Sequence, residues 1–229
     1  MYEKLTNAKS MLAAGFIATL AACASTGGTP AVETHDGLTL VPDTQFQAVY
    51  RKSGADLASY QEFGLAPCKV AFKKNWLRDQ NSNRLDLSNR VTQRDVDRIK
   101  DSLSAACDEQ FRSALLEDRP YALVEEFDNG EQVLIISPSI INLNINAPDV
   151  RSASMSRSYT TSSGEMTLSL ELTDATTGEV LARAVDKRRG MDDRHLTWTS
   201  SVTNMADANR TLKRWAAILR EGLDEARGQ

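Results

Sequence analysis

One short segment combines a histidine with carboxylates, the residue types that could exchange protons with a substrate or bind a metal. Asp192, Asp193 and His195 lie within four consecutive residues, so a hydrolase is one hypothesis for this chain. The only other histidine, His35, lies far away in a segment without apolar periodicity, so a conventional histidine-rich zinc site cannot form. The sequence also lacks a phosphate-binding glycine loop, a serine nucleophile elbow and an HExxH helix. The alternative is a solvated loop, and we expect no catalytic, cofactor or metal site.

Cys23 has the most specific surroundings of any residue in the chain. It ends the tetrapeptide Leu20-Ala21-Ala22-Cys23, which follows two lysines and closes an apolar run of twelve residues. A bilayer-spanning helix takes about 20 residues, so this run instead fits the apolar region of a signal peptide. The tetrapeptide resembles the lipobox of bacterial lipoproteins, whose cysteine is lipidated and becomes the first residue. We expect residues 1–22 to be a cleaved signal peptide and Cys23 to carry lipid; a plain secretory signal is the alternative.

The residues after Cys23 indicate where such a lipoprotein would go. Ala24, not aspartate, follows the cysteine, and by resemblance to the Gram-negative sorting rule this predicts the periplasmic face of the outer membrane. Acyl chains would anchor the protein there, because each buried methylene contributes about 0.8 kcal/mol. Residues 23–37 are rich in small residues, proline, glycine and threonine, which predicts a flexible tether. We expect residues 38–229 to form a single folded periplasmic domain.

The other two cysteines could form a disulfide. Cys68 and Cys107 lie on expected inward faces, one on a strand and one on a helix that would pack against it. The periplasm is oxidising, and closing a loop of this length would stabilise the fold by roughly 3–4 kcal/mol. Two buried reduced thiols are the alternative, because inward faces do not guarantee matching Cα positions. A nucleophilic role is disfavoured, since neither cysteine has a base nearby in sequence.

The overall composition is that of an ordinary globular chain. Of 229 residues, 41% are hydrophobic and 25% are charged, which excludes a fully disordered chain, a collagen-like fibre and a multispan membrane protein. The net charge of -4 argues against nonspecific nucleic-acid binding, and nothing in the sequence indicates an oligomeric state. A basic run, Arg183, Lys187, Arg188 and Arg189, could meet anionic lipid, a glycan or an acidic protein; an ordinary solvated strand end is the alternative.

Alternating apolar residues predict the strands that position these groups. There are five such stretches, at residues 63–73, 121–126, 132–146, 165–173 and 179–187. The Asp-Asn-Gly sequence at residues 128–130 predicts a hairpin between the second and third strands, and residues 174–178 predict one between the last two. Pro138 removes a backbone donor from the third strand, which predicts a bulge or an edge position there.

Apolar residues three and four apart predict two helices. The first begins at a Thr92 cap and ends near Leu115, and the second covers residues 205–226. The remaining stretches are expected to be residues 38–60 as an arm on the domain edge, 75–89 as a polar loop, 147–163 as a loop or exposed hairpin strand, and 188–204 as irregular chain. Trp76 and Trp198 would lie in two of these stretches, either as docking contacts or in buried edge packing.

The order of these elements predicts an α+β fold. We expect a mostly antiparallel sheet with two helices packed on one face, preceded by the signal peptide and the tether. The opposite face of the sheet would be polar, lined by Asn, Thr, Ser and Glu side chains. That face would be either solvated or covered by a partner.

Four stretches of the sequence resemble a known family. They are PDTQFQAVYRKSGADL at residues 42–57, VAFKKNW at 70–76, INLNINAPD at 141–149 and GEMTLSLELTDATTGEVLARAVD at 164–186. They are similar to proteobacterial lipoproteins catalogued as domain-of-unknown-function family 3313, and the similarity covers nearly the whole mature chain. The motifs carry no known chemistry, so the resemblance implies a lipoprotein and transfers no catalytic residue.

These observations leave three functional hypotheses. The leading one is an outer-membrane-anchored periplasmic lipoprotein that acts without catalysis, as an accessory or binding component of an envelope assembly, with an envelope protein as its partner. The second is a carrier that binds a lipid or glycan fragment in a groove beside the polar sheet face. The third is a hydrolase that uses the loop of Asp192, Asp193 and His195.

Overall fold

The computed structural model describes residues 30–82, 90–127, 132–145, 158–160, 164–189, 197–199 and 201–228. An eight-stranded mixed sheet has the order β1-β2-β9-β8-β6-β3-β5, and β4 also pairs with β6. The strands are β1 (Leu38–Val41), β2 (Ala48–Lys52), β3 (Glu62–Leu65), β4 (Lys69–Phe72), β5 (Ala122–Val124), β6 (Val133–Ile145), β8 (Gly164–Asp174) and β9 (Val180–Arg189). The helices are α1 (Trp76–Asn81), α2 (Gln93–Leu116) and α3 (Ser201–Ala226), with a short 3-10 helix η1 (Leu57–Ser59) and a separate ribbon of β7 (Ser158–Thr160) and β10 (Thr197–Thr199). The predicted α+β class is confirmed.

The centre of the sheet consists of its three longest strands. β6 pairs with β8 and β8 pairs with β9, all antiparallel, so the inward residues of the three strands share one face. Ile136, Ile140 and Leu168 on that face are fully buried. The predicted hairpin between β8 and β9 is confirmed: the Asp174 carboxylate accepts a hydrogen bond from the Thr177 backbone at 2.7 Å and closes the turn.

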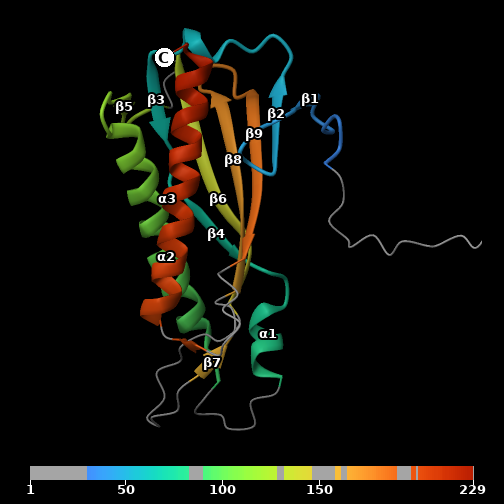
Figure 1. Ribbon diagram of the computed structural model, residues 1–229, viewed down its shortest axis with the longest axis vertical. Coiled ribbons are helices and arrows are strands. Elements are labelled where there is room, and N and C mark those ends of the chain that lie inside the picture. Colours follow the sequence, from blue (N-terminus) through green and yellow to red (C-terminus); the bar gives the residue numbers. More distant parts are fainter. Residues whose placement is uncertain are drawn as a thin grey trace, which may run out of the picture.

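Two long helices, α2 and α3, lie side by side on one face of the sheet, as predicted (Figure 1). α2 begins with a capping box, in which the Thr92 and Asp95 side chains each accept a hydrogen bond from the other's backbone N–H. Its apolar stripe and that of α3 meet the sheet, and Phe111 and Trp215 are completely buried there. Burying a large apolar side chain stabilises a fold by about 1.5–3 kcal/mol, so this layer is the main core.

The predicted hairpin between β5 and β6 is wrong. β3 lies between these strands and pairs in parallel with both of them. Parallel neighbours need a crossover connection, and α2 lies on the path that joins β3 to β5. The turn signal at residues 128–130 lies outside the described residues, and a local signal of this kind cannot reveal a strand inserted from 60 residues earlier in the chain.

The strand predicted over residues 63–73 is two strands, β3 and β4, separated by Ala66, Pro67 and Cys68. Pro138 on β6 lies opposite this break: Ala66 donates to the Ile136 carbonyl, and alternation points the Pro138 nitrogen toward the same edge. A missing donor is tolerated there because neither β3 nor β4 continues through the break. Pro138 is therefore neither at an edge nor at a bulge, and the bulge of β6 comes later, between Ile141 and Asn144.

Several stretches expected to be irregular contain regular structure. The arm predicted at residues 38–60 contributes β1 and β2 to the sheet, the loop predicted at 75–89 contains α1, and the chain predicted to be irregular at 188–204 contains the end of β9, β10 and the start of α3. These elements are short or begin among polar residues, so apolar periodicity does not reveal them. Trp76 in α1 is buried in edge packing against Phe72, one of the two alternatives for it.

Candidate functional site

The face of the sheet opposite α2 and α3 carries many of the polar side chains of the three longest strands. We call it the open face and define it by side chains on three adjacent strands: Ser137 and Ser139 on β6, Thr167, Ser169, Glu171 and Thr173 on β8, and Arg183 and Val185 on β9. Ile135 and Ile141 of β6 lie on the same face, opposite Thr173 and Thr167. Ser139 lies opposite Ser169, and Ser137 lies opposite Glu171. No described helix runs along this face (Figure 1). The face that the alternation predicts to be polar is therefore polar in part, with Ile135, Ile141 and Val185 among its hydroxyl and charged side chains.

The chemistry of the open face is that of a hydrogen-bonding surface. Its serine and threonine hydroxyls can donate and accept, and the serines are half-buried between neighbouring strands. At its border the aromatic ring of Phe127 lies over Gly64 of β3, where a Cβ atom would come within 2.6 Å of the ring. A glycine at this position therefore lets the chain after β5 pack closely against the sheet.

Arg183 forms the charged centre of the open face. Its guanidinium donates to Glu171 on β8 at 2.8 Å and forms two bonds, of 2.8 and 3.2 Å, with the Asp36 carboxylate. The hydrogen bond from Arg183 is the main reason that the pKa of Asp36 lies far below its usual range. The pair is therefore fully charged at neutral pH. It joins β9 to a segment that lies 147 residues earlier in the chain.

Asp36 belongs to a short turn, residues 32–37, which we call the N-terminal turn. Backbone bonds tie it to β1: Leu40 donates to Val32 at 2.9 Å, and Thr34 donates to Leu38 at 2.8 Å. Leu38 beneath it is only 2% exposed and packs with Tyr50 of β2. This end of the segment predicted as a tether is thus attached to the sheet. The His35 side chain on the turn is 91% exposed.

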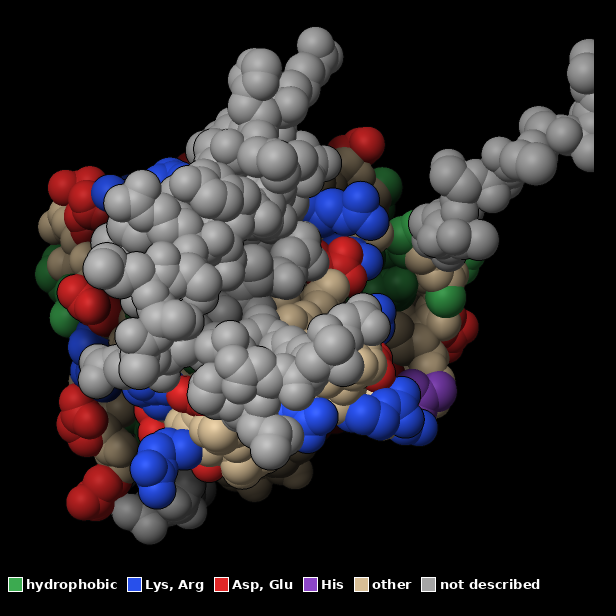
Figure 2. Space-filling view, turned by 90° about the horizontal axis from the view of Figure 1, so that it is seen from below, with side chains coloured by type: hydrophobic (Ala, Val, Ile, Leu, Met, Phe, Trp, Pro, Cys, Tyr) green, Lys and Arg blue, Asp and Glu red, His purple; other side chains and the backbone are tan. Residues whose placement is uncertain are grey.

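Carboxylates pair with every member of the basic run on β9. Besides Arg183, Lys187 and Arg189 both approach Glu165, at 3.1 and 3.5 Å, and Arg188 donates to Asp186 at 2.6 Å. Where described side chains are visible in the view of Figure 2, Lys and Arg likewise lie among Asp and Glu. The structure therefore does not favour the hypothesis that this run attracts an anionic partner.

Asp186 is a buried carboxylate that the sequence analysis did not single out. It is 2% exposed and lies on the helix side of β9. Besides the Arg188 guanidinium, it accepts hydrogen bonds from the Trp215 indole of α3 at 2.7 Å and from the Gln47 backbone N–H at 3.1 Å. These three bonds satisfy the carboxylate, so its role is to join α3, β9 and the start of β2. The signal that could have identified Asp186 in the sequence is its position: it is an aspartate at a place in β9 where the alternation points side chains inward.

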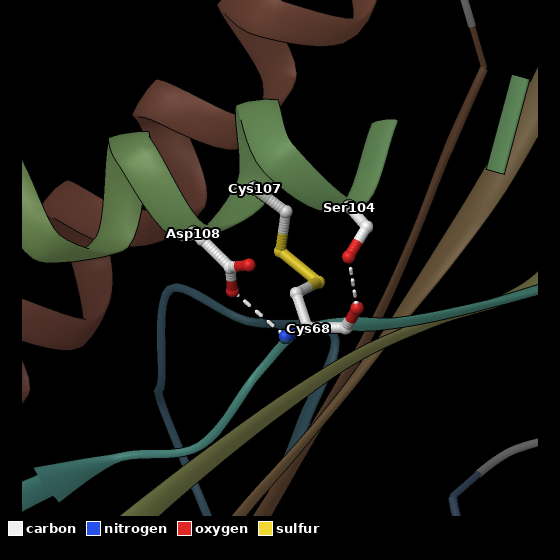
Figure 3. Close-up of a disulfide and its surroundings, with 4 residues drawn as sticks. All are labelled: Cys68, Ser104, Cys107 and Asp108. Atoms are coloured by element: carbon white, nitrogen blue, oxygen red, sulfur yellow. Dashed lines mark hydrogen bonds between the residues drawn. A yellow bond between two sulfur atoms is a disulfide. The ribbon is translucent and has the colours of Figure 1, made fainter. Parts of the chain in front are cut away.

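The structure joins Cys68 and Cys107 in a disulfide, one of the two alternatives that the sequence left open (Figure 3). Their Cα atoms are 6.1 Å apart, and both residues are buried. Two neighbours on α2 fix the Cys68 backbone: Asp108 accepts from its N–H at 2.7 Å, and Ser104 donates to its carbonyl at 2.6 Å. The disulfide thus fastens the break between β3 and β4 to α2, and neither sulfur is available as a nucleophile.

Arg220 is a second structural cation that the sequence analysis missed. It lies on α3 and donates to the carbonyls of Ala114, Glu117 and Arg119, where α2 ends and leaves carbonyls without helical partners. It also pairs with Asp224 on its own helix, at 3.0 Å. The two helices therefore end side by side and are locked together at that end.

Several predicted site residues lie outside the described residues. They are Cys23, Asp192, Asp193 and His195. Trp198 lies in β10, and its side chain is likewise outside the description. In the described ranges no group of three or more His, Cys, Asp and Glu side chains could hold a metal ion. Over the same ranges, no helix combines the length and apolarity that a bilayer crossing requires.

The fold and the open face together define a class: a small α+β domain with paired helices on one side of a mixed sheet and a polar surface on the other. The chain belongs to the family described as protein of unknown function (DUF3313), whose model matches residues 35–219. The resemblance noted in the sequence motifs is thereby confirmed. No curated protein is significantly similar to the chain in sequence.

Solved structures with a distantly similar outline include three bacterial proteins. A PelC dodecamer from Paraburkholderia phytofirmans is 12% identical, with a TM-score of 0.35, over 74% of this chain and 96% of that one. A candidate neuraminyllactose-binding hemagglutinin homolog from Helicobacter pylori is 10% identical, with a TM-score of 0.37, over 75% and 87%. A candidate lipoprotein from Caulobacter crescentus is 12% identical, with a TM-score of 0.28, over 76% and 90%. At such scores these likenesses support no inference about function.

Proposed function

We propose that the protein is an outer-membrane lipoprotein, anchored in the periplasm through Cys23, that binds another envelope protein without catalysing a reaction. The observation that carries the binding role is the open face, on which serine, threonine and paired charged side chains lie on three adjacent strands. Such a surface combines hydrogen-bonding groups with the apolar side chains of Ile135, Ile141 and Val185, and interfaces between separately folded proteins likewise mix apolar and hydrogen-bonding groups.

The anchoring part of the proposal is supported by the N-terminal sequence. A basic start, an apolar run of twelve residues and the tetrapeptide that ends at Cys23 follow one another in the order a lipoprotein signal requires. The first hydrogen-bonded residue of the described domain, Val32, comes only nine residues after Cys23. A lipid on Cys23 would therefore hold the folded domain close to the membrane, where its partner would also be found.

The test is site-specific photo-crosslinking in intact envelopes. A photoreactive amino acid replaces Ser169 on the open face, and in a matched control it replaces Asp101, an exposed residue of α2. We expect one reproducible protein adduct from position 169 and none from position 101. Adding Ser139→Arg next to position 169 should abolish the adduct, because a long cation on this face would obstruct the partner, whereas Asp101→Arg should not.

The outcome also separates the competing functions. No reproducible protein adduct at position 169, or an adduct that survives Ser139→Arg, would overturn the proposed binding surface. An adduct with a lipid or glycan at position 169 would instead support a carrier. The hydrolase hypothesis predicts that replacing Asp192, Asp193 and His195 together abolishes activity while the protein adduct remains.

A further inference from the structure

The chain between the proposed lipid and the folded domain is short. Val32, the first residue bonded to the sheet, follows Cys23 by nine residues, and a fully extended segment of that length reaches about 30 Å. A flexible chain of nine residues has an average end-to-end distance of only about 17 Å. The lipid surface would therefore lie within about 30 Å of the N-terminal turn at all times.

The domain is longer than this connecting segment between Cys23 and Val32, which we call the leash. β6 has 13 residues and α3 has 26, so each element alone is about 40 Å long. The N-terminal turn and β1 lie toward the end of the long axis at which the C-terminus is found, and α1 lies at the opposite end (Figure 1). An arrangement with the α1 end pressed end-on against the lipid would require more chain than the leash contains.

The N-terminal turn determines the leash length. Asp36 binds Arg183 through two bonds, and Thr34 accepts a bond from the Leu38 backbone at 3.0 Å. Without these contacts and the two backbone bonds that tie Val32 and Thr34 to β1, the first fixed residue would be Leu38, which follows Cys23 by fifteen residues. The reach would then be about 50 Å, which exceeds the length of the domain and would permit any orientation.

We propose that the N-terminal turn acts as a clamp that keeps β1 and β2 toward the lipid surface and the α1 end toward the periplasm. The proposal rests on the lipid anchor at Cys23 and concerns only how the anchored domain is oriented. The partner of the β1 side is the lipid surface itself. In this orientation the open face does not face the lipid surface. It points sideways, where a protein embedded in the membrane could reach it.

Energy transfer to labelled liposomes tests this orientation. The lipidated full-length protein is reconstituted in phosphatidylethanolamine and phosphatidylglycerol vesicles that contain a lipid-linked acceptor dye. A donor dye is placed on Ser53→Cys, next to β2, or on Asp79→Cys in α1; both positions are exposed, and the native thiols are already occupied. We expect transfer from position 53 to be about twice that from position 79, because the leash keeps the first near the lipid.

Two altered proteins sharpen the test. Thr34→Pro with Asp36→Ala removes the backbone and side-chain bonds of residue 34 and the pair with Arg183, and leaves a single backbone bond at Val32. Arg183 keeps its bond to Glu171, so the fold should remain and the transfer ratio should fall toward one. An insertion of about 15 glycine and serine residues after Ala24 lengthens the leash without touching the fold and should do the same. Circular dichroism confirms that each protein is folded.

The results distinguish the two proposals. Protein that does not float with the vesicles contradicts the lipid anchor. Protein that floats but transfers equally from both positions overturns the orientation alone. A ratio that stays unchanged when the turn is released would show that the N-terminal turn is not the clamp, and would also overturn this inference.

Discussion

Arg183 and Asp186 lie three residues apart on β9 and point to opposite faces of the sheet. Arg183 faces the open face and is bound by two carboxylates, whereas Asp186 faces the core and is bound by three donors. In each case a charged side chain joins segments that are far apart in sequence. A buried charge is tolerated only when its bonding capacity is satisfied, and Asp186 meets that condition; the partly exposed Arg183 is likewise paired.

The contribution of Asp186 can be measured by replacing it. Asp186→Ala should lower the free energy of unfolding by about 2–4 kcal/mol, because it leaves the buried Trp215 indole and the Gln47 backbone N–H without an acceptor. Urea denaturation followed by tryptophan fluorescence measures the change. The matched control is Glu165→Ala, which removes a partly buried carboxylate from ion pairs with Lys187 and Arg189, both more exposed, and should cost no more than about 1 kcal/mol. Equal losses in the two variants would contradict the role assigned to Asp186.

At the scale of elements, the junction of β3 and β4 is the point where local and long-range structure meet. Pro67 lies in this break and Pro138 lies opposite it on β6, and Cys68 is bonded to α2 by its disulfide and by two hydrogen bonds. A strand interruption would ordinarily be a weak point in a sheet. Here the disulfide and the two side chains from α2 fasten it to the helix layer.

The disulfide should account for a measurable part of the stability. Replacing both Cys68 and Cys107 by alanine opens a loop of 39 residues and should lower the free energy of unfolding by roughly 3–4 kcal/mol. Urea denaturation with and without reductant measures this change. Reductant should shift the midpoint of the parent protein and leave that of the double variant unchanged. A parent protein that is insensitive to reductant under unfolding conditions would contradict the prediction.

The elements that periodicity predicts are the long ones. β8 alternates clearly and is joined to β9 by a strong turn signal, and α2 carries both a cap and a continuous apolar stripe, so local sequence is enough to define them. β1, β2 and β5 have three to five residues each and are strands because of the strands beside them. The insertion of β3 between β5 and β6 depends on contacts across the whole domain, which no window of local sequence contains.

The candidate site could be predicted only in outline. Alternation in β6 and β8 predicts a polar sheet face, since every second residue there is serine, threonine or glutamate over part of their length. The pairing of Asp36 with Arg183 could not be predicted, because Asp36 lies in a stretch whose composition resembles that of a linker. Its order comes from a partner on β9, far away in sequence.

At the scale of the whole molecule, one side of the sheet is packed by α2 and α3, and no described helix covers the other. The N-terminal turn attaches the start of the chain to the border of that second side, so the proposed anchor and the proposed binding surface lie close together. A lipid-anchored domain of this design would present its open face near the membrane on which its partner is expected.

The lipid anchor is the claim on which this account depends, and the mass of the mature N-terminus tests it most directly. The full chain is produced in a Gram-negative cell, its outer membrane is isolated, and the N-terminal peptide is measured by mass spectrometry. We predict that the peptide begins at Cys23 and carries acyl chains, and that Cys23→Ser removes the acyl mass and the protein from the outer-membrane fraction. A peptide with an unmodified Cys23, or a Cys23→Ser protein that stays in that fraction, would contradict the account.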